Sequence, residues 1–299
     1  KGLIACKPRL DSNPRRLPTI SDYMNPEVVG EQLPKSATNH IEGNQPLLSV
    51  KDLSVSYPGK RRKESVTAVD RVSFEIHKGE TLGLVGESGC GKTSLGRALL
   101  QLISEKSGTV IYKGTRINDL SEKKFRSFRR AMQIVFQDPY SSLNPRKTIG
   151  SILGEPLIIH KLVSSKKEIH AECIRLLDQV GLPASSLNMY PHQFSGGQRQ
   201  RIGIARALAC RPDFIVLDES VSALDVSVQA QVINLLNDLK DALDLTYLFI
   251  SHDLTVVKYV SDRVIVMSAG EIVERGDAEQ IYLNPASSYT RKLIDSIPQ

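Results

Sequence analysis

Apolar residues along this chain form short runs that predict a β-sheet with helices between its strands. Two continuous apolar runs, at 214–217 and 247–250, have the pattern of buried parallel strands. The first is followed directly by Asp218 and Glu219, and the second is followed two residues later by His252. Because ligands of parallel sheets bind beyond the carboxyl ends of the strands, these three residues are candidates for a functional site.

Other apolar positions predict further strands on both sides of these two runs. Apolar residues between 48 and 76 indicate short strands of an antiparallel sheet near the N-terminus. Strand-like runs recur at 108–112 and 132–136, and runs at 264–267 and 272–273 predict a hairpin turning at Ala269-Gly270.

The stretch from about 138 to 206 has a mainly helical pattern. Ile169, Cys173, Leu176, Leu177 and Val180 fall on one helix face, and Gly181 follows as a helix end. We therefore expect an α-helical subdomain inserted between strands of the sheet.

The strongest chemical signal lies between an apolar run at 81–85 and a helical pattern. It fits the phosphate-binding motif G-x-x-x-x-G-K-[ST] and reads Gly86, Glu87, Ser88, Gly89, Cys90, Gly91, Lys92, Thr93, followed by Ser94. In this motif, backbone N–H groups surround a triphosphate, and the lysine reaches the β- and γ-phosphates. The threonine hydroxyl binds the Mg²⁺ that accompanies the nucleotide. An incidental glycine-rich turn would not require strand, loop and helix in this order.

The helix after this loop is expected to begin near Gly91 and to turn one apolar face to the core. That face comprises Leu95, Ala98, Leu99, Leu102 and Ile103. The fold class predicted from these patterns is α/β. We expect a phosphate-loop NTPase core with a mostly parallel sheet, an N-terminal antiparallel β subdomain and the inserted helical subdomain.

Three further positions are candidates with two interpretations each. Ser195, Gly196, Gly197 and Gln198 precede a helix and offer a second anion-binding surface. Tyr57 ends the first predicted strand, where it could stack on an adenine ring or be a core or turn tyrosine. A lone histidine often has a structural role, but the position of His252 at the end of a strand favours catalysis.

Composition narrows the class of protein. The chain has 299 residues, 40% of them apolar, which is sufficient for a large core. No apolar run approaches the roughly 20 residues of a membrane-spanning helix, so we expect any link to a membrane to come through a partner. The four cysteines are scattered without a C-x-x-C pair, which fits reduced thiols better than disulfides or zinc.

The charge pattern argues against nucleic acid as a partner. The formal net charge of +6 is mild, and the densest basic runs lie at 60–63 and 123–130. No set of aromatic residues interleaves either run as a stacking platform, so solvated loop and helix faces explain them better than a nucleic-acid footprint.

The order of these motifs resembles the nucleotide-binding domain of ATP-binding cassette (ABC) transporters. The matching elements are the phosphate loop, Gln137, 195–198, Asp218-Glu219, the Ser-Ala-Leu-Asp run at 222–225, and His252, and the resemblance covers roughly residues 47–299. The segments 135–146 and 190–194 are similar to the ATPases of oligopeptide and dipeptide permeases.

The resemblance implies that two cassettes sandwich ATP and Mg²⁺. Each nucleotide would lie between one phosphate loop and the Ser195–Gln198 element of a second cassette, which could be a homodimer partner, a heterodimer partner or an upstream half of the same chain. Asp218 would hold Mg²⁺, Glu219 would polarise the attacking water and His252 would contact the γ-phosphate. Gln137 would sense Mg²⁺ and water, Tyr57 would stack on adenine and Asp225 would lie at the dimer seam.

The function implied by this resemblance is ATP hydrolysis that drives import of a peptide-like solute. The expected partners are transmembrane permease subunits and, indirectly, an extracytoplasmic solute-binding protein. The expected location is peripheral, at the cytoplasmic face of the inner membrane. The alternatives are a soluble ABC ATPase that acts on nucleic acid or the ribosome, and an exporter.

The chain divides into three expected regions. Residues 1–46 are rich in proline and read as a linker, 47–270 as the cassette and 271–299 as a C-terminal extension of the oligopeptide-permease type. Residues 1–8 align weakly with 291–298, which suggests the end of an upstream cassette, against the alternative of coincidence.

Departures from the family pattern put specific points in doubt. Ser220 stands where the family commonly has proline, and Ser287-Ser288 replace a usual His-Pro in the extension, whose function is therefore open. No cysteine follows Cys210, so no iron–sulfur cluster is expected in this tail.

Overall fold

A computed structural model describes residues 16–19, 45–58, 65–104 and 106–297. The predicted repeat in residues 1–8, and most of the predicted linker, lie outside the described residues. The chain divides into two compact units. The first unit contains 130–245 together with 16–19, and the second contains 45–129 and 246–297 without the gaps given above.

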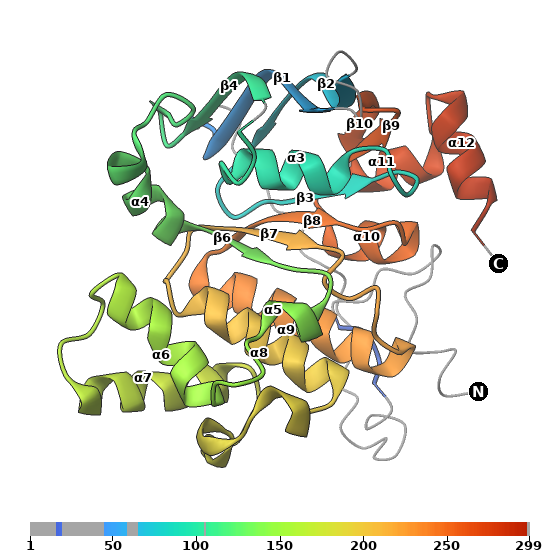
Figure 1. Ribbon diagram of the computed structural model, residues 1–299. Helices are drawn as coiled ribbons and strands as arrows, with labels where there is room; N and C mark the ends of the chain where they lie inside the picture. The colour runs from blue at the N-terminus through green and yellow to red at the C-terminus, as the bar shows by residue number, and fades with distance from the viewer. Residues whose placement is uncertain (1–15, 20–44, 59–64, 105, 298–299) are drawn as a thin grey trace. The chain divides into compact units, whose positions relative to one another are not determined.

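The second unit contains an antiparallel sheet, as predicted. Its strands are β1 (Leu48–Pro58), β2 (Ser65–Ile76), β4 (Lys106–Tyr112) and β5 (Thr115–Arg116), in the order β2-β1-β4-β5 (Figure 1). Val50 pairs with Phe74 on one side and with Val110 on the other, and all three side chains are buried. Burial of one face by such apolar residues holds the register of the strands.

A mixed sheet in the same unit carries the phosphate loop. β3 (Thr81–Val85) pairs in parallel with β8 (Thr246–Ile250) and with β9 (Arg263–Ser268), and β10 (Glu271–Asp277) closes an antiparallel hairpin with β9. Every residue of β3 and β8 is buried. Their continuous apolar sequences therefore reflect burial on both faces of the sheet.

The helices of the second unit are α3 (Lys92–Leu99), α4 (Glu122–Ala131, which reaches the boundary of the unit), α10 (Leu254–Val260), α11 (Ala278–Leu283) and α12 (Ser288–Asp295). The prediction that Leu102 lies on the core face of the first helix was wrong. α3 ends at Leu99, and Gln101 turns the chain with φ 56°, which leaves Leu102 52% exposed.

The first unit contains two parallel strands and most of the helices. β6 (Met132–Val135) pairs with β7 (Phe214–Asp218). The helical elements are α5 (Pro139–Ser142), α6 (Ile149–Ile159), α7 (Lys166–Gln179), η2 (Ala184–Asn188), η3 (Pro191–Gln193), α8 (Gly196–Leu208) and α9 (Val226–Leu243). The predicted helix face at 169–180 is α7, whose Cys173, Leu176 and Leu177 are buried.

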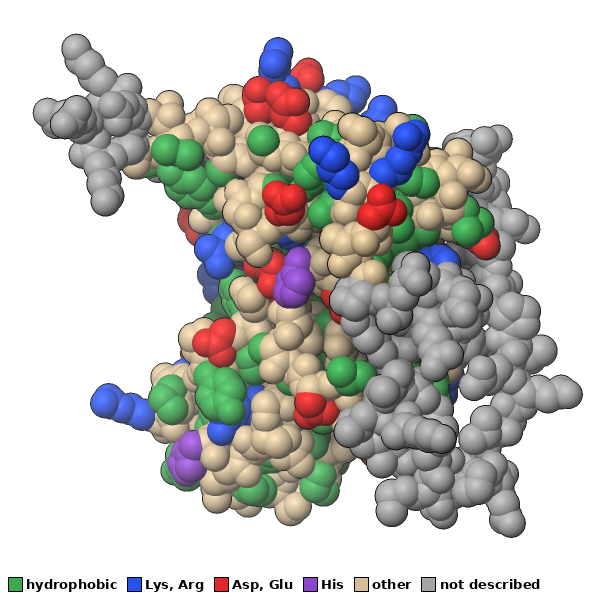
Figure 2. Space-filling view, turned by 90° about the vertical axis from the view of Figure 1, so that its right-hand side faces the viewer, with side chains coloured by type: hydrophobic (Ala, Val, Ile, Leu, Met, Phe, Trp, Pro, Cys, Tyr) green, Lys and Arg blue, Asp and Glu red, His purple; other side chains and the backbone are tan. Residues whose placement is uncertain are grey.

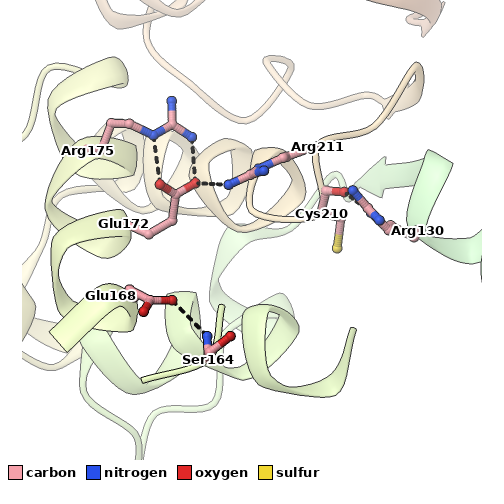
Figure 3. A network of polar contacts seen from close by, with 7 residues as sticks. All are labelled: Arg130, Ser164, Glu168, Glu172, Arg175, Cys210 and Arg211. Carbon is pink, nitrogen blue, oxygen red and sulfur yellow. Dashed lines mark hydrogen bonds and ion pairs between the residues drawn. The ribbon is translucent and has the colours of Figure 1, made fainter. Parts of the chain in front are cut away.

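A polar network joins α7 to the end of α8 (Figure 3). Glu172 on α7 accepts hydrogen bonds from Arg175 at 2.9 and 2.7 Å, and Arg211 lies at 3.5 Å. The hydrogen bond from Arg175 lowers the pKa of Glu172. Nearby, Arg130 donates to the carbonyl of Cys210 at 3.2 Å. These contacts fasten the turn that leads from α8 into β7.

The segment Arg16–Thr19 packs on α9 as an extended strap. The Leu17 N–H donates to Asn234 Oδ1 at 2.9 Å, and Asn234 Nδ2 donates to the Leu17 carbonyl at 2.8 Å. Leu17 is 1% exposed and Asn234 is 3% exposed. An amide that binds both polar groups of one residue recognises an extended backbone, and here the two partners are 217 residues apart.

Candidate functional site

The carboxyl ends of β3 and β8 bring the phosphate loop and His252 to one edge of the sheet. Leu84 pairs in parallel with Ile250, and the Ser251 N–H donates to the Leu84 carbonyl at 3.2 Å. Gly86 and His252 therefore both lie just beyond this edge of the sheet. His252 is exposed, so its imidazole is accessible to a ligand.

The backbone of the phosphate loop adopts a shape that a side chain would prevent. Gly91, the residue before α3, has φ 105°, and a Cβ there would lie 2.0 Å from the carbonyl oxygen of Ala68. No side chain caps the first N–H groups of α3. The start of this helix therefore presents N–H groups and the positive end of its dipole, which suits an anion.

Lys92 places a buried ammonium group inside the loop. It is 4% exposed, and its Nζ donates to the carbonyls of Gly86 at 2.7 Å and Glu87 at 2.9 Å. The Cys90 sulfur lies 3.7 Å away. A buried cation next to uncapped N–H groups makes the loop a fitting site for phosphate, in agreement with the motif.

Neighbouring segments support the loop from two sides. The Gly270 N–H, in the turn between β9 and β10, donates to the Cys90 carbonyl at 3.1 Å. The Tyr57 hydroxyl donates to Ser94 Oγ at 3.1 Å, and Tyr57 is 36% exposed, so it is not a core residue. Sequence reasoning identified Tyr57 but missed the role of Gly270, which it treated only as a turn.

The carboxyl ends of β6 and β7 bring Gln137 and Glu219 together in the first unit. Val135 pairs in parallel with Leu217, and Gln137 and Glu219 each follow two residues after these partners. Gln137 Nε2 donates to Glu219 Oε2 at 2.8 Å, which orients the carboxylate. Glu219 has φ 46°, a left-handed conformation that is uncommon for a residue with a side chain. Ser222 stabilises this turn by donating from its hydroxyl to the Glu219 carbonyl at 2.8 Å.

The candidate Mg²⁺ residues suit an ion that keeps most of its own ligands. Asp218 ends β7 in the first unit and is 4% exposed, and Thr93 is the second residue of α3 in the second unit. Across the described part of the chain, no cluster of three or more His, Cys, Asp or Glu side chains forms a metal site. Mg²⁺ usually binds one or two protein oxygens together with water and phosphate oxygens, so each of these side chains, taken by itself, is of a kind that Mg²⁺ accepts.

The Ser195–Gln198 element forms the start of α8. Ser195 Oγ accepts from the Gln198 N–H at 3.3 Å, and Gln198 Oε1 accepts from the Ser195 N–H at 3.0 Å, which is a capping box. Gly197 is buried, and a Cβ there would lie 2.1 Å from Val228 Cγ1 on α9. The glycine is thus required for the close packing of α8 on α9.

Asp225 and Ser220 flank the turn that follows Glu219. Asp225 caps α9, and the hydrogen bond from the Val228 N–H holds the pKa of this carboxylate below its usual value. Ser220 is 2% exposed, and its hydroxyl has no hydrogen-bond partner among the described residues. Burial of this hydroxyl without a hydrogen bond therefore destabilises the folded state.

Comparisons with known proteins agree with these motifs. The family model described as "ABC transporter" matches residues 69–222. An oligopeptide transport ATP-binding protein OppF of Bacillus subtilis is 53% identical over 253 residues, which are 84% of this chain and 82% of that protein. The protein of the same name from Streptococcus mutans is 49% identical over 86% of this chain and 83% of its own length. A putative peptide import ATP-binding protein of Brucella ovis is 53% identical over 85% of this chain and 79% of its own length.

Solved structures with a similar fold include an ATP-binding cassette named MJ0796. Its dimeric post-hydrolysis structure, bound to ADP and Pi, has a TM-score of 0.69 and 28% identity, and the match covers 77% of this chain and 98% of that one. The structure of cbiO1 from Clostridium perfringens has a TM-score of 0.70 over 81% of this chain and 92% of that one, at 24% identity, and is evidence of the fold alone.

Proposed function

The chain belongs to the ABC transporter family of ATP-binding proteins, and from this premise we propose that its ATP hydrolysis powers the import of a peptide-like solute through partner membrane subunits. The observation that carries the proposal is the similarity to named peptide-import ATPases, at about half identity over most of both chains. Because the relatives reported above are named for oligopeptide transport or peptide import, they favour this interpretation over an ATPase that acts on nucleic acid or ribosomes and over an exporter.

Binding of ATP is assigned to the second unit. The N–H groups of the phosphate loop and the start of α3 would bind the phosphate oxygens, and Lys92 would exchange its bonds to two loop carbonyls for bonds to phosphate. Tyr57 stands at the end of β1, next to Ser94, where it would stack on the adenine ring. His252 would contact the γ-phosphate from the end of β8.

Hydrolysis needs a group that takes a proton from the attacking water, and Glu219 is proposed for that step. Its carboxylate is held by the Gln137 amide at 2.8 Å, which restricts its orientation before the water is bound. The Thr93 hydroxyl would bind Mg²⁺, and Asp218 would hold the ion through water. When bound, Mg²⁺ neutralises charge on the phosphate oxygens. Gln137 is proposed to report on water and Mg²⁺ through its bond to Glu219.

A second cassette is proposed to complete each nucleotide site. The capping box at Ser195 fixes the start of α8 by binding the N–H groups of Ser195 and Gln198, and the two glycines between them would offer their N–H groups to an anion. Asp225 at the start of α9 is exposed and available to a partner. The similar cassette MJ0796 was solved as a dimer, which supports a dimeric arrangement for this chain.

Permease subunits are the proposed membrane partners. Among the described residues, no helix is long and apolar enough to cross a membrane. On the face drawn in Figure 2, Lys and Arg side chains are interspersed with Asp and Glu, without one basic patch. This face therefore lacks the clustered basic residues that binding of a nucleic-acid backbone usually needs.

The proposed contact surface for the permease is a groove between α6 and α7 in the first unit. The groove has a volume of about 650 Å³, and its lining includes Ile158, Ile159 and Ile169. Ile158 is 59% exposed and Ile159 is 48% exposed, so apolar side chains here face solvent in the isolated chain. An amphipathic segment of a membrane subunit would bury them.

The proposed function is tested by reconstitution in liposomes. The full chain is combined with its permease subunits and solute-binding protein, and ATP-dependent uptake of labelled peptides is measured. The expected result is uptake that requires ATP and a peptide-loaded binding protein, and loss of uptake with Glu219→Gln. ATPase activity that responds to RNA or ribosomes and not to peptide would overturn the proposal.

A variant of the groove separates coupling from catalysis. Ile158→Asp with Ile159→Asp is expected to lower uptake by about tenfold or more, because apolar anchors carry much of the energy of an interface. The basal ATPase activity of the isolated chain should not change. The exposed Lys167→Gln on α7, which does not line the groove, serves as the control.

A further inference from the structure

The C-terminal extension reaches the phosphate loop through one tyrosine. The Tyr289 hydroxyl on α12 accepts the N–H of Glu87 at 3.4 Å, across 202 residues of sequence. The carbonyl of the same residue, Glu87, accepts Lys92 Nζ at 2.9 Å. A short chain of hydrogen bonds therefore runs from the extension through the loop to the lysine that is assigned to bind phosphate.

Specific contacts hold Tyr289 in place. The Glu274 carboxylate on β10 accepts the N–H groups of Ala286 at 2.7 Å and Ser287 at 3.0 Å, and Ser287 Oγ caps α12 by accepting the Tyr289 N–H at 3.2 Å. Burial acts to raise the pKa of Glu274, but the Thr290 side chain, the hydrogen bonds from these two N–H groups and the nearby Arg291 together hold it below the usual value. The serine that departs from the family pattern at 287 is thus the cap that orients Tyr289.

A second tyrosine anchors the extension beside His252. Tyr282 on α11 is 7% exposed, and its hydroxyl donates to the carbonyl of Leu254. Leu254 begins α10, two residues after His252. The extension therefore contacts both segments that leave the carboxyl ends of β3 and β8.

We propose that the extension is a positioning element for nucleotide binding and that Tyr289 is its positioning residue. By accepting the Glu87 N–H, the hydroxyl limits rotation of the peptide group between Gly86 and Glu87, and the Gly86 carbonyl of that same peptide group accepts Lys92 Nζ at 2.7 Å. A loop that is ordered before binding loses less entropy when ATP binds. Tyr289 thus raises the affinity for ATP without touching the nucleotide. The inference rests on the proposed binding of ATP at this loop and is independent of the imported solute.

The test is Tyr289→Phe in the full chain, which removes the hydroxyl and keeps the ring. One hydrogen bond of this kind is worth a factor of roughly 2 to 10. We expect the Kd for Mg-ATP to rise by that factor, with kcat and the melting temperature unchanged. Amide hydrogen exchange at Glu87 should become faster. Glu274→Gln, which weakens the anchor of α12, should raise the Kd in the same direction.

The control is Lys292→Gln, an exposed neighbour on α12. It should leave the Kd and the exchange rate of Glu87 as in the unmodified chain. An unchanged or lower Kd in Tyr289→Phe would overturn the inference, as would unchanged exchange at Glu87. Because the readouts are nucleotide affinity and exchange in the isolated chain, failure of peptide uptake would refute only the transport assignment.

Discussion

The strand pairs β3–β8 and β6–β7 deliver candidate site residues in the same way but build different kinds of site. The loop after β3 offers backbone N–H groups, and its shape depends on Gly91. This residue has φ 105°, and a Cβ on it would lie 2.0 Å from the Ala68 carbonyl oxygen. The edge of β6–β7 depends on two side chains, Gln137 and Glu219, joined at 2.8 Å. The backbone site therefore depends on the absence of a side chain at Gly91, whereas the side-chain site depends on single functional atoms of Gln137 and Glu219.

The largest effect is expected where a single side-chain atom matters. Glu219→Gln should lower ATP turnover by roughly 100-fold or more, because general-base assistance is commonly worth that much, while ATP binding is retained. Phosphate release measures turnover, and binding of a fluorescent nucleotide measures affinity. The exposed Glu279→Gln is the control. Turnover at the level of the unmodified chain would refute the assignment of Glu219.

A change in the phosphate loop should lower the affinity for Mg-ATP itself, before any effect on the hydrolysis step. Lys92→Ala removes the charged donor of the loop and should weaken Mg-ATP binding by about 10- to 100-fold, as expected for a charge-assisted hydrogen bond. Equilibrium titration with nucleotide measures this. Arg97→Ala on the exposed side of α3 is the matched control. Unchanged affinity in Lys92→Ala would contradict the loop assignment.

Two glycines sharpen the comparison further. Gly197→Ala should cost about 1–3 kcal/mol of folding stability by overpacking against Val228, and Val228→Ala should recover part of that loss in the double variant. Gly91→Ala has no such rescue, because its obstacle is the backbone carbonyl of Ala68. Chemical denaturation of the single and double variants measures both. Strict additivity at 197 and 228 would show that this contact does not matter.

The smallest effect concerns the residue after Glu219. Ser220→Ala removes a buried hydroxyl without a partner in the described part of the chain and should stabilise the fold by about 1 kcal/mol. Urea unfolding checks this, with the exposed Ser296→Ala as control. A loss of stability would mean that the hydroxyl is satisfied after all.

Much of the fold could be predicted because its signals are local. The buried strands β7 and β8 have continuous apolar sequences, and the loop motif requires a strand before it and a helix after it. Leu102 was misplaced because the end of α3 is set by a left-handed turn at Gln101, which no apolar period reveals. The i, i+3, i+4 spacing of apolar residues continues beyond Leu99, but it no longer predicts burial once the helix has ended.

The candidate site could be predicted as a set of residues but not as a geometry. The motif order identified Gln137 and Glu219 separately, and their hydrogen bond follows from parallel pairing of the strands before them. The contact of Tyr289 with Glu87 could not be predicted, because it links positions 202 residues apart through the packing of α12. The roles of these residues in ATP hydrolysis remain predictions.

The strap on α9 has a consequence for how this sequence can diverge. Asn234 binds the N–H and carbonyl of Leu17, which every residue except proline offers, and the Leu17 side chain is the most deeply buried of the strap at 1% exposed, with Thr19 at 6%. Arg16 meets Asp238 at 3.6 Å on an exposed surface, where an ion pair contributes little. Selection should therefore retain an asparagine at 234 and an apolar residue at 17 as a pair, while Arg16 is free to drift.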